Sequence, residues 1–207
     1  MQDFLKKIHW LGHDAFRIEG ETIVYMDPFQ IKAGPIADLI LISHEHFDHC
    51  SPDDVKKIQQ SKTVIVTEKD SAKKLSGDVR VIKPGDSIMI DKVKVEAIPS
   101  YNLDKHFHPK KNGWLGFILE MDGVRLYHAG DTDFIPEMEN LKVDIALLPV
   151  SGTYVMNSDQ AVKAALAIKP KIAIPMHYGA IVGSDQDATQ FKQALTGKVE
   201  VVILNQE

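Results

Sequence analysis

Short apolar runs separated by turn residues recur along the whole chain and predict many short strands. Residues 37–43 form a short, mostly apolar run typical of a buried strand, and Val93, Val95 and Ala97 alternate with polar residues. Asp122-Gly123 predicts a hairpin turn that joins strands at 115–121 and 124–128. Further strands are predicted at residues 21–26, 62–67, 143–150, 171–175 and 199–204.

Helix signals follow these strands in each half of the chain. Ser51 and Pro52 have the types of an N-cap and a first helical residue, and Asn157 with Gln160 forms a capping-box pattern for a helix that ends near Ile168. Other helices are predicted after residue 67, through Leu75, and at 185–196. Many strands with grouped helices favour two packed sheets covered by helices over a regular βαβ array.

Length and composition are those of one globular domain, which we expect to span residues 1–207. No apolar stretch is long enough for a signal peptide or a membrane-spanning helix, so we expect a cytoplasmic protein with no membrane partner. The net charge of -5 argues against broad nucleic-acid binding. The single cysteine, Cys50, excludes an internal disulfide; it could be a ligand or a reactive thiol, and packing at a helix start is favoured.

The run from His44 to His49, His-Glu-His-Phe-Asp-His, is the strongest chemical signal in the chain. Its three imidazoles and the Asp48 carboxylate have the types and the density of metal ligands, and a chance match is expected on the order of once in a thousand such chains. The run lies between a predicted strand and a predicted helix. In an extended stretch His44 and His46 project to one side, whereas Asp48 and His49 lie beyond and could hold a second ion.

Two other predicted strands also end on a potential ligand, Asp131 after the hairpin and His177 after residues 171–175. Alone, each would be interpreted as an ordinary hydrogen-bonding residue, but beside the first motif both become candidate ligands. His13 and His128 are interpreted as residues that support the ligands or pack near them, and Asp27 as a residue that orients a ligand or forms a turn.

These motifs resemble those of the metallo-β-lactamase superfamily of metal-dependent hydrolases. The resemblance rests on the run at 44–49, on Gly130-Asp131-Thr132 and on Pro175-Met176-His177-Tyr178. Trp10-Leu11-Gly12-His13, the turn at 27–29 and Tyr127-His128-Ala129 look most like its ascorbate-phosphate-lactonase-like subgroup. The resemblance implies an α/β protein with a four-layer αββα sandwich and a dinuclear site along one edge of the sheets.

The resemblance also implies which residues bind two divalent metal ions, with zinc expected first and manganese or iron as alternatives. Asp131 would bridge the ions, and Asp48, Asp131 and His177 would be the catalytic residues as well as ligands. The first ion would be bound by His44 and His46, and the second by Asp48, His49 and His177.

One departure from the superfamily pattern concerns the third histidine of the first ion. It should fall near residues 98–102, where this chain has none. His106 and His108 are close enough to replace it, and His108 is preferred because Pro109 constrains its backbone. The alternative is a first site with fewer protein ligands.

The expected reaction is direct hydrolysis of a small, anionic ester, lactone or phosphodiester by a metal-bound hydroxide. Lys105, Lys110 and Lys111 carry the expectation of an anionic substrate, although charged loops are often only solvated. Alternatives are a diiron redox protein, a nuclease and a non-catalytic metal-binding module. The sequence leaves the oligomeric state open.

Overall fold

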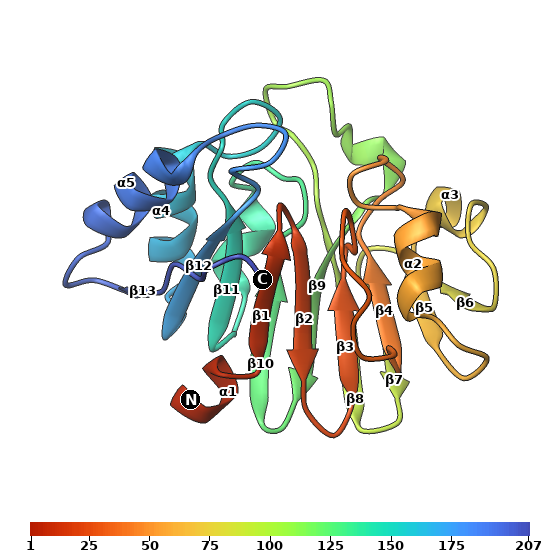
Figure 1. Ribbon diagram of the computed structural model, residues 1–207. Helices are drawn as coiled ribbons and strands as arrows, with labels where there is room; N and C mark the ends of the chain where they lie inside the picture. Colours follow the sequence, from red (N-terminus) through yellow and green to blue (C-terminus); the bar gives the residue numbers. More distant parts are fainter.

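Two β-sheets pack face to face in the computed structural model, which describes residues 1–207 (Figure 1). The six strands of the first sheet lie in chain order, and the seven strands of the second sheet lie in the reverse order, from β13 to β7. The first sheet contains β1 (Ile8–Gly12), β2 (Ala15–Glu19), β3 (Ile23–Met26), β4 (Leu39–Ile42), β5 (Val64–Thr67) and β6 (Asp78–Val81). The second contains β7 (Ser87–Ile90), β8 (Val93–Pro99), β9 (Leu115–Met121), β10 (Val124–His128), β11 (Ile145–Pro149), β12 (Ile172–Met176) and β13 (Glu200–Val201).

The direction of the strands determines which loops meet. In the first sheet β1 and β3 are each antiparallel to β2, and β4 is parallel to β3, so β1, β3 and β4 point the same way. In the second sheet β8 and β10 are each antiparallel to β9, and β10, β11 and β12 are parallel. The carboxyl ends of these strands therefore gather at one edge of each sheet, and the two edges form the upper face in Figure 1.

The main core, a cluster of 48 buried apolar residues, fills the space between the sheets and continues to the outer face of the second sheet, where residues of two helices such as Ala165 and Phe191 join it. Strand β4 shows how the sequence builds two faces: Leu39 and Leu41 join this core, whereas Ile40 and Ile42 join a smaller cluster on the opposite face of the sheet. Val55 and Ile58 of helix α2 complete that smaller cluster. This period of two explains why a continuous apolar run forms a strand that is buried on both faces.

Helices cover the outer faces of both sheets, which confirms the predicted four-layer αββα sandwich (Figure 1). On the first sheet lie α2 (Pro52–Ile58), with Ser51 as its N-cap, and the single turn α3 (Lys69–Ala72). On the second lie α4 (Ser158–Ile168), which has the predicted capping box, and α5 (Asp185–Ala194). The short helices are α1 (Gln2–Leu5) and the 3₁₀ turns η1 (Lys110–Asn112) and η2 (Pro136–Asn140). None of these helices combines the length and the apolar character needed to cross a bilayer.

Some element boundaries differ from the sequence prediction. The predicted helix through Leu75 is only the single turn α3, because the Lys74 amide returns to the Ser71 carbonyl and tightens the chain there. The last strand is shorter than residues 199–204, since the chain leaves the sheet after Val201 and pairs at Gln206 with Trp10 of β1. Cys50 is buried in the smaller cluster beside α2, which agrees with the packing interpretation.

Candidate metal centre

Loops from six strands bring the predicted site residues together at the upper edge of the two sheets (Figure 1). His13 and Asp27 follow β1 and β3, the run at 44–49 follows β4, and His108, Asp131 and His177 follow β8, β10 and β12. Because all six strands end at this edge, residues up to 164 positions apart in sequence share one site, His13 and His177 being the most distant pair.

The first ligand group consists of His44, His46 and His108. One ring nitrogen from each lies within 4.8 Å of the others, and the Nε2 of His44 is 3.0 Å from the Nδ1 of His46. The Nδ1 of His108 is 3.1 Å from the side-chain oxygen of Asn102, which leaves its Nε2 directed to the centre. His106, the other candidate, is exposed. The structure thus places His108, and not His106, beside the first two histidines.

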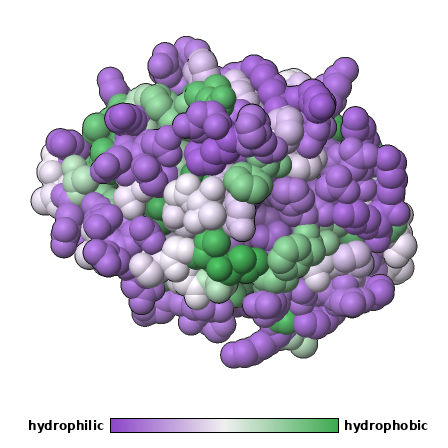
Figure 2. All heavy atoms as spheres, turned by 90° about the horizontal axis from the view of Figure 1, so that it is seen from above, coloured by the Kyte–Doolittle hydropathy of each residue, from purple (hydrophilic) through white to green (hydrophobic).

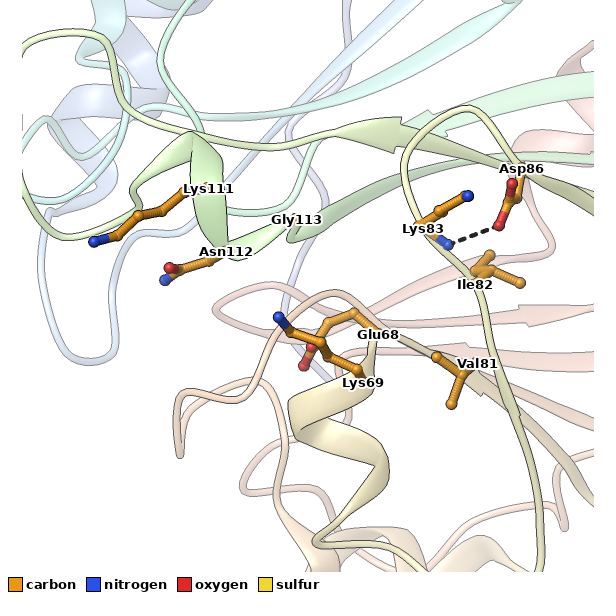
Figure 3. Close-up of a pocket in the computed structure, with 9 residues that line it drawn as sticks. All are labelled: Glu68, Lys69, Val81, Ile82, Lys83, Asp86, Lys111, Asn112 and Gly113. Atoms are coloured by element: carbon orange, nitrogen blue, oxygen red, sulfur yellow. Dashed lines mark hydrogen bonds between the residues drawn. The ribbon is translucent and has the colours of Figure 1, made fainter.

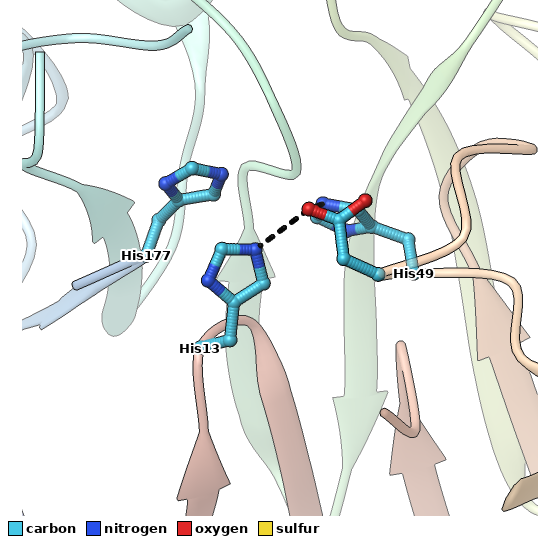
Figure 4. Close-up of side chains that lie close together, drawn as sticks. His13, His49 and His177 are labelled. Carbon is cyan, nitrogen blue, oxygen red and sulfur yellow. Dashed lines mark hydrogen bonds and ion pairs between the residues drawn. The ribbon is translucent and has the colours of Figure 1, made fainter. Parts of the chain in front are cut away.

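The second ligand group consists of His13, Asp48, His49 and His177, whose ligand atoms also lie within 4.8 Å of one another. Figure 4 shows the rings of His13 and His177 close together, with the ring of His49 across from both. The ring centres of His13 and His177 are 4.1 Å apart, and the Nε2 of His13 is 3.2 Å from the Oδ2 of Asp48. His13 therefore lies among the potential ligands themselves, closer than a residue that only supports them.

Asp131 lies between the two groups, with one carboxylate oxygen facing each. Its Oδ1 is 3.3 Å from the Nε2 of His49 and 3.2 Å from that of His177. Its Oδ2 is 3.1 Å from the Nε2 of His108 and 4.0 Å from that of His44. The position of Asp131 depends on Gly130, which has a φ of +61° and where a Cβ atom would approach the Leu115 carbonyl oxygen to 2.8 Å. This arrangement is the one a bridging carboxylate requires.

Several residues contact the ligand side chains on the side that faces away from the centre. The Asp27 carboxylate lies 2.8 Å from the Nδ1 of His49, and the Ser43 hydroxyl, which donates to Asp27, lies 3.0 Å from the Nδ1 of His44. Such contacts fix the orientation of a ring and leave its other nitrogen free for a metal. His128 differs, because its hydrogen bonds reach only the backbone of Asp14 and Gly130 and so support the loops.

Two residues that the sequence interpretation missed also belong to the site. The Trp114 ring covers the first group: its centre lies 4.7 Å from those of His44 and His46 and 5.4 Å from that of His108. Asp14 is fully buried, and neither of its carboxylate oxygens has a hydrogen-bond partner. A turn acid and a tryptophan at a strand start are common in any chain, and only the position of Asp14 directly after His13 could have drawn attention to it.

The electrostatics of the site favour a bound cation. Burial lowers the pKa of His44 well below its usual range, so this ring is a neutral ligand. Burial also opposes a charge on His49, but the adjacent Asp131 and Asp27 carboxylates raise its pKa well above the usual value. Burial raises the pKa of Asp14 to about 8. Asp131 and Asp27 therefore draw positive charge to the second group, whereas Asp14 is mostly protonated and uncharged at neutral pH in the metal-free site.

Unpaired buried atoms give an independent test of whether a metal fits. The Nε2 atoms of His49, His108 and His177 and the Oδ1 of Asp131 are buried and make no hydrogen bond of acceptable geometry. Leaving such atoms unpaired costs about 1–3 kcal/mol each, and nearly all buried polar atoms in proteins are paired. All four point into the same centre, and imidazole and carboxylate suit zinc, manganese and iron. The residues fit divalent metal ions.

The lysines expected to attract an anionic substrate do not face this centre. Lys105 is bound to Asp133, and Lys110 is 2.9 Å from Glu137. Lys111 lines a different pocket, beside Lys69 and Lys83, which contains none of the candidate ligands (Figure 3). These lysines therefore do not support the expectation of an anionic substrate.

A sequence model of the beta-lactamase superfamily domain matches residues 7–177 of the chain. The UPF0173 metal-dependent hydrolase Ta0764 of Thermoplasma acidophilum is 36% identical over 96% of this chain and 94% of that protein. Among solved structures, a protein from Parabacteroides distasonis with a proposed activity of metal-dependent hydrolase is 37% identical, with a TM-score of 0.86 over 97% of this chain and 93% of that one. Igni18, a metallo hydrolase of Ignicoccus hospitalis, is 25% identical, with a TM-score of 0.79 over 96% of this chain and 94% of that one.

Proposed function

The chain belongs to the beta-lactamase superfamily, and on this basis we propose that it is a metal-dependent hydrolase with a dinuclear centre at the upper edge of its sheets. The observation that carries the proposal is Asp131, whose two carboxylate oxygens face two separate ligand groups. The subgroup of ascorbate-phosphate-lactonase-like proteins remains a prediction. It also remains a prediction that residues 1–207 act as one domain in the cytoplasm. The free, buried Cys50 is compatible with a reducing compartment.

The proposed ligands come from the two groups in the structure, except that His13, whose Nε2 is 3.2 Å from Asp48, is assigned to hold that carboxylate. The first metal ion would be held by His44, His46 and His108, and the second by Asp48, His49 and His177, with Asp131 between them. Divalent ions at these positions would acidify a water molecule and polarise the carbonyl or phosphoryl group of a substrate. Zinc is proposed first, and manganese or iron would suit the same ligands.

The protein's own residues prepare the site for hydrolysis. Asp48 is the carboxylate of the second group that lines the cleft, so it is placed to receive the proton that an attacking water loses. His13 Nε2 holds that carboxylate at Oδ2. In the overall reaction the bond between the acyl or phosphoryl group and the leaving oxygen breaks. The acyl or phosphoryl group gains the hydroxyl of water, and the leaving oxygen gains a proton.

The proposed substrates are small esters, lactones or phosphodiesters. A phosphodiester would place its negative charge at the reacting centre, against the metal ions, so an anionic substrate would not need the lysines of the 105–111 segment. The oligomeric state does not enter this proposal, because every proposed ligand comes from one chain.

The experiment is a comparison of metal content and turnover. Purified protein loaded with zinc or manganese is assayed against panels of esters, lactones and phosphodiesters, alongside His46→Ala and Asp131→Ala. We expect turnover by the wild type that falls by at least 100-fold in both variants. Equal turnover in all three proteins would refute the proposal, and bound metal without any turnover would identify a non-catalytic metal-binding protein.

A further inference from the structure

The opening of the metal centre combines polar ligand side chains with apolar ones. It has a volume of about 240 Å³, and its polar lining consists of the side chains of His46, Asp48, His108 and Asp131. The rest of the lining is apolar or aromatic and comes from four different loops: Phe47, Phe107, Tyr154 and Ile181. Viewed from above, Figure 2 shows apolar (green) side chains beside the hollow in the middle of this face, within a mostly hydrophilic surface.

These side chains remain exposed although burial would be favourable. Phe47 is 70% exposed, Phe107 51% and Ile181 41%. Only ten large hydrophobic side chains are exposed in the whole protein, so three of the ten line this one small opening. Contiguous exposed apolar groups around a polar site are typical of a ligand-binding surface.

Aromatic contacts hold the opening in shape. The Phe107 ring packs edge-on against the Tyr154 ring, with centres 4.7 Å apart. Phe47 packs in the same way against the largely buried Phe29, at 5.8 Å. Because both exposed rings are supported by a second ring, the apolar surface is formed before a ligand arrives.

No lysine or arginine side chain lines the opening. The lining includes two carboxylates, Asp48 and Asp131. A second anionic group on a substrate, away from the reacting bond and the metal ions, would therefore find no lysine or arginine to pair with and would lose its hydration against apolar side chains.

We propose that this opening is a subsite for an uncharged apolar group of the substrate, either a single aromatic ring or a short branched alkyl chain. The volume is below the roughly 300 Å³ that is the lower end for drug-sized ligands, which limits the group to about one ring. The inference rests on the proposed metal-dependent hydrolysis, because it assigns the part of the substrate next to the bond that is cleaved. Phe107 and Ile181 are then specificity-determining residues.

Binding of hydroxamates to the metal-loaded protein tests the subsite without requiring turnover. Hydroxamates chelate metal ions, so acetohydroxamate and phenylacetohydroxamate would bind the metal through the same group. They differ only in the phenyl ring that can enter the opening. By calorimetry we expect phenylacetohydroxamate to bind at least tenfold more tightly. Phe107→Ala and Ile181→Ala should each reduce this preference several-fold. Met89→Ala, which removes a 56% exposed side chain on β7, should leave the preference unchanged.

A second pair of ligands tests the charge. Butyrohydroxamate and succinomonohydroxamate have the same chain length, but the second ends in a carboxylate. We expect the carboxylate to weaken binding by about tenfold, and tighter binding of the anion would overturn the assignment of an uncharged group. Equal binding of the two ligands in the first pair, or binding of neither, would overturn the apolar subsite.

Turnover is measured separately with methyl acetate and methyl phenylacetate, which differ only in the phenyl ring. In the variants of the opening, KM for the phenylacetate should rise by about fivefold to tenfold, whereas kcat and the acetate reaction change little. A hydroxamate preference without turnover of any ester, lactone or phosphodiester would refute the proposed function and leave the subsite standing. Turnover without a hydroxamate preference would refute the subsite and leave the proposed function standing.

Discussion

Replacing Asp27 with asparagine is expected to weaken zinc binding by about 10- to 100-fold, although the side chain keeps its size. The Oδ1 of Asp27 accepts a hydrogen bond of 2.7 Å from the Ser43 amide. Its Oδ2 accepts one of 2.5 Å from the Ser43 hydroxyl and lies 2.8 Å from the Nδ1 of His49. Both carboxylate oxygens are thus acceptors, and the His49 ring that donates to Asp27 keeps its Nε2 for the metal.

Asparagine cannot reproduce this arrangement, because its side chain has only one oxygen. In one orientation its NH₂ group faces the Ser43 amide, and in the other it faces the Nδ1 of His49, so a donor meets a donor either way. A buried donor left unpaired costs about 1–3 kcal/mol. For a protein of this size that corresponds to a decrease of roughly 2–12 °C in the melting temperature of the metal-free protein. The loss of metal affinity corresponds to about 1.4–2.7 kcal/mol.

The assay is a competition titration in which a chromophoric chelator and the protein share a limiting amount of zinc. Asp53→Asn is the matched control, because Asp53 is an exposed acid on α2 that contacts only Lys56 at the surface. Asp27→Ala should lose about as much affinity as Asp27→Asn. Wild-type zinc affinity in Asp27→Asn would refute the reasoning, since it would show that the carboxylate does not orient His49.

Three further outcomes are expected. His108→Ala should lose about one equivalent of metal by mass spectrometry under native conditions, whereas His106→Ala should keep the wild-type content; equal contents would place the third histidine elsewhere. The pKa of Asp54 is lowered by contacts that outweigh its burial, among them that with Lys57. Its stabilisation is therefore present above the unfolded pKa and is lost as the pH falls through the lower folded pKa, so Asp54→Asn should cost about 1 kcal/mol by urea unfolding at pH 7 and progressively less as the pH is lowered below 3.8; a cost that does not change with pH would contradict this. Burial raises the pKa of the Cys50 thiol to about 11, so iodoacetamide should modify it only after unfolding, and Cys50→Ala should retain full turnover; rapid labelling of the native protein would show that the thiol is accessible.

Elements with strong local signals could be predicted from the sequence. The hairpin at Asp122-Gly123 has the predicted arms, and the capping box of Asn157 and Gln160 opens α4. The proline after His108 favoured this residue over His106, and the structure buries His108 beside His44 and His46. In each case a few neighbouring residues contain the whole signal.

Contacts between the two sheets could not be predicted, because no local pattern encodes them. Trp114 reaches the three histidines of the first group because the next residue, Leu115, donates its amide to the Ser43 carbonyl on the other sheet. The ion pair of Lys105 with Asp133 likewise joins two loops that are 28 residues apart. A charged loop in the sequence therefore gave no information about where its charges point.

The backbone at the site explains why periodicity could not locate these residues and what the metal contributes to the fold. His13, Asp27 and His177 all have positive φ, at 51°, 41° and 60°, and none is a glycine. Each such residue costs on the order of 1–3 kcal/mol, and it persists only where its surroundings hold it. Here the His13 carbonyl accepts hydrogen bonds from the His177 amide and from the Trp10 ring, so the turns after β1 and β12 stabilise each other.

These turns direct imidazoles and carboxylates to one point, where without a cation several of their atoms remain buried and unpaired. Because metal binds the folded arrangement and not the dispersed ligands, its binding free energy offsets this strain. The centre is accordingly expected to be the least stable part of the metal-free protein and among the most stable parts of the metal-bound one.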